Sequence, residues 1–146
     1  MSFWSRFLKK DLKTIELLQK DLDSIMGKTS SEFMGIVGLM GKIKGLDLVS
    51  SISDSCKYDH KQVKGIYAKM IEAYLRFKNL NFNPGNNLSL QYMSFEYNMG
   101  ASFCVIPFSN RDDVAIVTLT QNIQKIQKKM DNISDLLKKL EEDRGD

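Results

Sequence analysis

The sequence predicts an α+β fold: three N-terminal helices, a small three-stranded antiparallel meander and a long C-terminal helix. Three observations lead to this fold class. Apolar residues recur at helical spacing over residues 3–26, they recur again over 121–143, and they alternate with polar residues between positions 88 and 120. The chain has 146 residues, of which 42% are hydrophobic and 27% charged. This length and composition suit a single folded domain, 1–146, and not a disordered chain.

The first predicted helix spans residues 3–26. Its apolar residues recur at steps of three and four positions, which is the period of one helical face. They are Leu8, Leu12, Ile15, Leu18, Leu22 and Ile25. Gly27 and the serines before Glu32 are typical of a helix end followed by a new helix start.

The second predicted helix starts with the stretch FMGIVGLMGKIKG, residues 33–45, and runs to about residue 53. It contains four glycines, although each one weakens a helix interior by about 0.5–1 kcal/mol relative to alanine. On a helical wheel the bulky apolar residues share one side and the glycines the opposite side. The bulky residues are Phe33, Ile36, Val37, Leu39, Met40, Ile43 and Leu46, and the glycines are Gly35, Gly38, Gly41 and Gly45.

Three interpretations fit this glycine-rich segment. In the first, the glycines let another backbone approach closely; we favour it because helices that are apolar on most sides are usually buried. In the second, residues 33–49 bind a membrane surface, since a bulky apolar face opposite small residues suits an interfacial helix. In the third, the segment is irregular and its glycines lie in turns.

A third helix is predicted over residues 60–78, with Asp59 as its N-cap, and it completes a helical part at 1–78. Its apolar residues again follow helical spacing. They are Val63, Ile66, Tyr67, Met70, Ile71, Tyr74 and Leu75. Pro84 and Gly85, with asparagines around them, indicate a break after this helix.

A β meander is predicted over residues 88–120. Residues 88–92 and 93–97 alternate in opposite phases, which indicates a β-bulge between Tyr92 and Met93. Two further strands are expected after short turns. They span residues 102–108 and 114–120, with turns at 98–101 and 109–113.

The clearest predicted element is a coiled-coil-like helix over residues 121–143. Its apolar residues step alternately by three and four positions, as in the a and d positions of a heptad repeat. They are Ile123, Ile126, Met130, Ile133, Leu137 and Leu140. The same phase extends back to Ile116, so an all-α bundle with 112–143 as one helix is the alternative. The β-branched residues of 114–120 favour a strand there.

The sequence contains no recognisable catalytic motif. Cys56, Asp59 and His60 lie close together, but a structural zinc site generally needs four ligands and the fourth is missing. Cys104 lies in an apolar run, which is typical of a buried thiol. We therefore expect no enzymatic activity, no cofactor, no metal and no small-molecule substrate.

Nucleic acid is the third and weakest candidate partner. The net charge is +3, and Lys125, Lys128 and Lys129 form a modest basic cluster that is more typical of a solvated helix face. The predicted order of a helix, three strands and a helix resembles that of double-stranded RNA-binding domains. This resemblance implies RNA or DNA binding on the order of elements alone.

The predicted function is that of a non-catalytic assembly protein acting through helix–helix contacts. The heptad residues would contact another copy or another helical protein, and a homo-oligomer is favoured. The alternative role of the same residues is to close the chain's own core. A peripheral membrane protein that uses residues 33–49 is the second candidate. Two cysteines without a spacing pattern, and no apolar leader, indicate a cytoplasmic protein, at a membrane surface in the second case.

Overall fold

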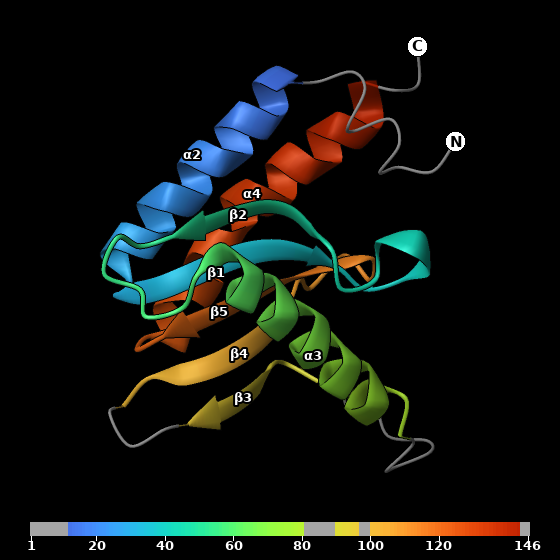
Figure 1. Ribbon diagram of the computed structural model, residues 1–146. Helices are drawn as coiled ribbons and strands as arrows, with labels where there is room; N and C mark the ends of the chain where they lie inside the picture. The colour runs from blue at the N-terminus through green and yellow to red at the C-terminus, as the bar shows by residue number, and fades with distance from the viewer. Residues whose placement is uncertain (1–11, 81–89, 97–99, 144–146) are drawn as a thin grey trace.

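Five antiparallel strands form one sheet, and helices pack on both of its faces (Figure 1). This computed structural model describes residues 12–80, 90–96 and 100–143. In chain order the elements are α2 (Leu12–Lys28), β1 (Ser31–Gly38), the short 3-10 helix η1 (Gly41–Ile43), β2 (Asp47–Ile52), α3 (His60–Lys78), β3 (Met93–Glu96), β4 (Ser102–Pro107), β5 (Val114–Thr120) and α4 (Ile123–Asp143).

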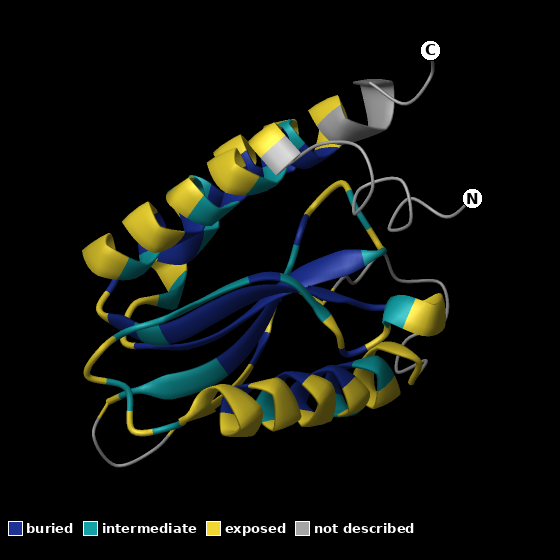
Figure 2. Cartoon of the chain, turned by 45° about the horizontal axis from the view of Figure 1, so that its top comes forward, coloured by how far each residue is buried: buried dark blue, intermediate teal, exposed yellow. Residues whose placement is uncertain are grey.

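The sheet separates two apolar cores. Its strand order is β2-β1-β5-β4-β3, so β1 and β5 lie in the middle and β2 and β3 form the edges. Met34 and Ile36 of β1 face α2 and α4, whereas the alternate residues Phe33 and Val37 face α3. The strands are mostly buried, and each helix keeps one side exposed to solvent (Figure 2).

The helix predicted over residues 33–53 is wrong, because these residues form β1, a turn with η1, and β2. β1 is paired with β2 on one side and with β5 on the other, and all but one of its residues are buried. A strand that is covered on both faces is apolar at consecutive positions, so its sequence lacks the alternation that distinguishes a strand from a buried helix. The N-terminal part is therefore helix, strand, strand, helix.

The glycines of this segment serve close approach and turns. A Cβ atom at Gly35 would lie 2.6 Å from Cζ of Tyr67, and one at Gly38 would overlap a backbone oxygen across the turn. Gly41 and Gly45 have φ angles of 64° and 80°, which L-residues rarely adopt. Close approach is thus the reason for the first two glycines, within a strand, and turn geometry for the last two.

Four other predicted elements are confirmed. The helix over 60–78 is α3, and Asp59 caps it: its carboxylate accepts from the Gln62 backbone N–H at 2.8 Å, while the Gln62 side chain accepts from the Asp59 N–H. The predicted strands at 102–108 and 114–120 are β4 and β5, and the C-terminal helix is α4. Because 114–120 is a strand, the all-α alternative is wrong.

The observed meander has a shorter first strand than predicted, and it is part of a larger sheet. β3 contains only Met93–Glu96, and residues 90–92 form no strand, so the bulge predicted at Tyr92 is wrong. β5 pairs with β1 as well as with β4, which gives five strands instead of three. The order of elements therefore no longer favours nucleic acid as a partner. Positions 88–89 and 97, and residues 3–11 of the first predicted helix, lie outside the described residues.

Candidate assembly surface

The heptad residues of α4 pack against the rest of their own chain. Four of them are at most 6% exposed: Ile126, Met130, Ile133 and Leu137. They share one core with α2 and with the sheet, and Ile123 packs partly buried against it. Leu140 belongs to α4, but its side chain lies outside the described part. Partner binding by these residues stays a prediction. The contacts that they make within the chain correspond to the alternative role, which is to close the monomer's own core.

The glycine-rich segment is divided between core and surface. Its buried apolar residues are Phe33, Ile36, Val37 and Leu39. Ile43 is half-buried, and Met40 is exposed. Residues 33–49 form β1, a turn with η1 and the start of β2, so they do not form the continuous amphipathic helix expected for membrane binding. Within the described ranges, no helix is long and apolar enough to cross a bilayer.

Exposed apolar side chains gather around β3 and the end of α3. We call this group the β3 surface; it consists of Phe77, Leu80, Leu90, Tyr92 and Phe95. Met93, at the start of β3, packs in the same core cluster as Tyr74 near the end of α3. Phe77 follows Tyr74 by one helical turn and Tyr92 directly precedes Met93, so these exposed side chains lie next to residues of one buried cluster. Figure 1 shows β3 as the lower edge strand of the sheet, on the side of the molecule where α3 lies.

Phe95 extends this surface along the sheet. It is 44% exposed, and it lies directly across from Phe103 in the β3–β4 register. Phe103 is part of an aromatic cluster, with its ring centroid 6.0 Å from that of Tyr58 and 6.1 Å from that of Phe33. Phe95 and Met93 are two positions apart in β3, and Met93 packs in the core on the α3 side, so Phe95 lies on the α3 side of the sheet next to these aromatic rings.

The two edges of the sheet differ in how they are covered. At β2, the Gln19 side chain of α2 donates to the Ser50 carbonyl at 3.0 Å, and Asp23 accepts from the Ser51 hydroxyl. At β3, no strand of the described residues pairs with the outer edge. An unpaired edge offers backbone N–H and C=O groups to another strand. The polar edge of β3 and the apolar β3 surface therefore lie together.

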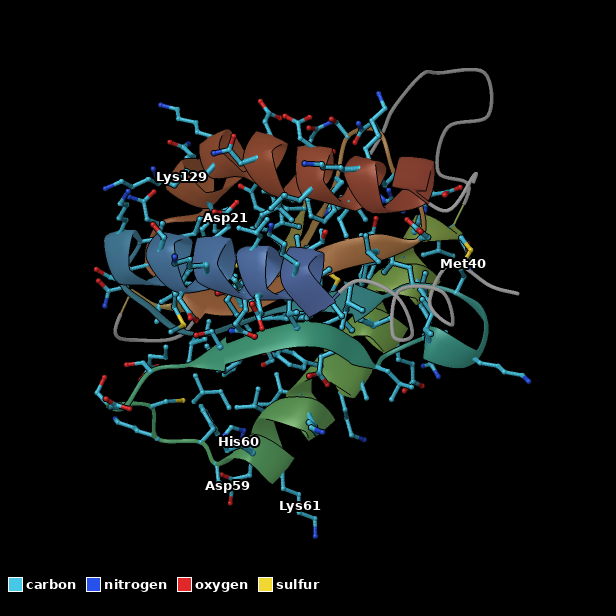
Figure 3. The ribbon with its side chains drawn as sticks, turned by 90° about the horizontal axis from the view of Figure 1, so that it is seen from above. Asp21, Met40, Asp59, His60, Lys61 and Lys129 are labelled. Carbon is cyan, nitrogen blue, oxygen red and sulfur yellow. The ribbon has the colours of Figure 1, made fainter. Side chains whose placement is uncertain are left out.

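The residues that suggested chemistry do not form a site. Burial raises the pKa of the Cys104 thiol to about 12, so the thiolate that a nucleophile needs does not form near neutral pH. His60 lies exposed at the start of α3, beside the capping residue Asp59 (Figure 3). Among the described residues, no three histidines, cysteines or acidic residues are placed to hold a metal ion.

The β3 surface was not predictable from the sequence as a surface. Phe95 and Tyr92 belong to apolar–polar alternation that equally fits a strand with a buried face. Their exposure depends on α3 covering only part of its side of the sheet, which is a property of the tertiary arrangement. The sequence feature that could have indicated this surface is the group of apolar residues Leu80, Leu90 and Tyr92 near the break at Pro84 and Gly85.

No protein-family model matches the sequence, and no curated protein matches it significantly. Solved structures share its fold. One is MglB with a tetrameric arrangement, which has a TM-score of 0.68 and 10% identity over 90% of this chain and 92% of that chain. Another is the gliding protein MglB from Thermus thermophilus, with a TM-score of 0.67 and 11% identity over 90% and 93%. The fold is thus MglB/roadblock-like, and at this identity the likeness concerns the fold alone.

Proposed function

We propose that this chain is a non-catalytic interaction module that assembles with further copies of itself through the β3 surface. One observation carries the proposal. Eight large hydrophobic side chains are exposed in the described part of the chain, and five of them lie on or next to β3 or at the end of α3. A concentration of exposed apolar side chains beside an open edge is typical of a protein–protein contact.

A two-fold contact between two β3 strands would satisfy both parts of this surface. The strands of two copies would pair antiparallel, and each copy would present the same residues to the other. β3 has four residues, so strand pairing alone supplies few hydrogen bonds. Burial of Phe95 and Tyr92, together with Phe77 at the end of α3, would add the apolar contribution that a stable interface needs.

Two further observations support self-association at this place. Four of the six heptad residues of α4 are already buried against α2 and the sheet, so these four are not free to pair with another helix unless the core opens. MglB, which shares the fold, is described with a tetrameric arrangement. Self-association is thus compatible with this architecture, and β3 is the edge that the described chain leaves open for it.

The test is the mass of the particle in solution, measured by light scattering after size-exclusion chromatography over a range of concentrations. Wild type is expected to be a dimer or larger. Phe95→Lys is expected to shift the particle to one chain, because a lysine in the contact would be desolvated opposite its own copy. Leu17→Lys on α2, where the leucine is 41% exposed, is the matched control and should leave the mass unchanged.

Two results would overturn the proposal. A folded wild type that stays monomeric at all concentrations would exclude self-association. An oligomer that persists in Phe95→Lys but dissociates in Leu17→Lys would place the contact on the α2 side. Circular dichroism of each variant verifies that the fold is retained.

By analogy of fold alone, we further propose that the assembled form binds a small GTPase. A direct test mixes the purified chain with small GTPases of its own organism, each loaded with GDP or with a non-hydrolysable GTP analogue. Binding that depends on the nucleotide would support this partner class, and absence of binding to both forms would contradict it. Since self-association is measured separately, either proposal can fail without the other.

A further inference from the structure

The turn between β1 and β2, residues 39–46, carries two exposed apolar side chains that belong to no other surface. Leu46 is 59% exposed and Met40 is 46% exposed. Ile43, between them, packs partly buried against the core shared by α2 and α4. Figure 3 shows Met40 at the periphery of the molecule, beside η1. The turn therefore points Leu39 and Ile43 inward and two apolar residues outward.

Backbone hydrogen bonds hold this turn in a fixed shape. The Gly38 N–H donates to the Leu46 carbonyl at 3.0 Å, and the Gly45 N–H donates to the Gly38 carbonyl at 2.9 Å. The Leu39 N–H donates to the Asp113 carbonyl at 2.8 Å and so ties the turn to the start of β5. Because its backbone is already ordered, a ligand that binds the outward side chains need not order the turn first.

Lysines surround the two outward side chains. Lys42 and Lys44 are exposed, and within the described residues neither forms an ion pair. The backbone at Gly45 approaches α3 closely, since a Cβ there would lie 3.2 Å from Cα of Ala68. Lys64, also exposed, precedes Ala68 by one helical turn. Three lysines are thus placed on or beside the turn.

Acidic residues offset this charge only in part. Asp113 is paired with Arg111 at 2.7 Å, and Asp47 is half-buried with its charge acting on the buried Tyr67 hydroxyl. Asp112 is exposed in the adjoining turn. Among the described residues, the exposed charges on and beside the turn are therefore mostly positive, and they lie next to apolar side chains.

We propose that the turn 39–46 binds an anionic lipid surface. Met40 and Leu46 enter the boundary between headgroups and acyl chains, and Lys42 and Lys44 contact lipid phosphates. Apolar residues flanked by lysines combine the two contributions that bring a protein to an anionic membrane surface. The contact is a preformed turn, in place of the helix predicted over 33–49, and it does not require the β3 surface.

The test is co-sedimentation of the full chain with phosphatidylcholine vesicles that contain or lack phosphatidylserine. Wild type is expected to bind the vesicles with phosphatidylserine, and added salt should weaken the binding. Lys42→Gln with Lys44→Gln should weaken it by about fivefold for each lysine. Met40→Ser with Leu46→Ser should weaken it by about tenfold.

Matched control variants change exposed residues of α2 and α4 in place of residues of the turn. Lys138→Gln with Lys139→Gln removes the same charge from exposed positions of α4, and Leu17→Ser removes an exposed leucine from α2. Both controls should bind vesicles like wild type. Thermal melts of all variants verify that they are folded.

Three outcomes would overturn the proposal: no binding of folded wild type to phosphatidylserine vesicles, equal binding with and without phosphatidylserine, or the same loss in the α4 controls as in the turn variants. Phe95→Lys serves to separate the two contacts. Vesicle binding by this variant should still depend on phosphatidylserine and on Lys42 and Lys44. Its overall affinity for vesicles should fall only because assembly is lost.

Discussion

Gly35 leaves the space that the ring of Tyr67 fills. Tyr67 is fully buried, its ring lies 5.8 Å from that of Phe33, and its hydroxyl is hydrogen-bonded to the Ser50 hydroxyl at 2.6 Å. These contacts come from three different elements, β1, β2 and α3. A single missing side chain in β1 therefore lets the helix lie close to the sheet.

Gly35→Ala is expected to destabilise the protein by about 1–3 kcal/mol, because the new methyl group would overlap a ring that has no room to move. Gly65→Ala is the control: it lies in α3 with nothing within 4 Å of the added Cβ, and should stabilise by about 0.5–1 kcal/mol. Urea unfolding measures both changes. Equal effects of the two substitutions would contradict this account of Gly35.

Tyr67 also gives stability a dependence on alkaline pH. Burial raises the pKa of its hydroxyl above that of an exposed tyrosine. Below pH ~10 both folded and unfolded chains keep the proton, so this group adds no pH dependence. Above that pH the unfolded chain releases the proton and the folded chain does not, so the free energy of unfolding falls as pH rises.

Tyr67→Phe should therefore lose less stability than wild type when the pH is raised above ~10. At neutral pH the same variant should be less stable by about 1 kcal/mol, because the hydrogen bond to Ser50 is lost. Cys104 and Tyr74, whose pKa values burial also raises, keep part of the slope in both proteins. Urea titrations at several pH values measure the slopes, and identical slopes would argue against the role of Tyr67.

Among the elements, α3 and α4 were predictable from their helical period and β5 from its β-branched residues, whereas β1 and β2 were not predicted. α3 and α4 each alternate buried and exposed residues at the helical period, and Asp59 marks where α3 begins. β1 is covered on both faces, so its residues carry no period that a sequence can show. The spacing of α4 indicated a buried stripe, but spacing does not tell whether the covering helix is in the same chain. Here α2 covers it.

Ile126→Ala tests the role of α4 within the monomer. It should destabilise the fold by about 2–5 kcal/mol, because Ile126 is fully buried in the α2–α4 core. Lys128→Ala, exposed on the same helix, should change stability by no more than about 0.5 kcal/mol. At a temperature where Ile126→Ala is folded, light scattering should find the mass of wild type. Dissociation of a folded Ile126→Ala would instead favour the heptad as an interface between chains.

At the scale of the whole molecule, the sheet organises the chain into two sides with different surroundings. Among the described residues, α2 and α4 together cover one side and α3 is the helix on the other, with the β3 surface next to its end. Assembly through this surface would complete the cover. Folding stability and assembly would then be coupled, because only the folded chain has the surface.

The midpoint of thermal unfolding should accordingly rise with protein concentration in wild type. Phe95→Lys should melt at one temperature at all concentrations, and Leu17→Lys should behave like wild type. Differential scanning calorimetry at several concentrations measures the midpoints. A midpoint of wild type that does not depend on concentration would contradict the coupling.

The contact between α2 and β2 has a consequence for the size of any assembly. A sheet with two open edges can add copies without limit, as a fibre does. In this chain the Gln19 side chain of α2 donates to the Ser50 backbone carbonyl, a group that an incoming strand could use, and Asp23 holds the Ser51 hydroxyl beside it. If copies join at β3, the edges left in such a pair are the two β2 strands, and each of these lies against its own α2. The contact between α2 and β2 would then favour an assembly that stops at two copies over one that grows.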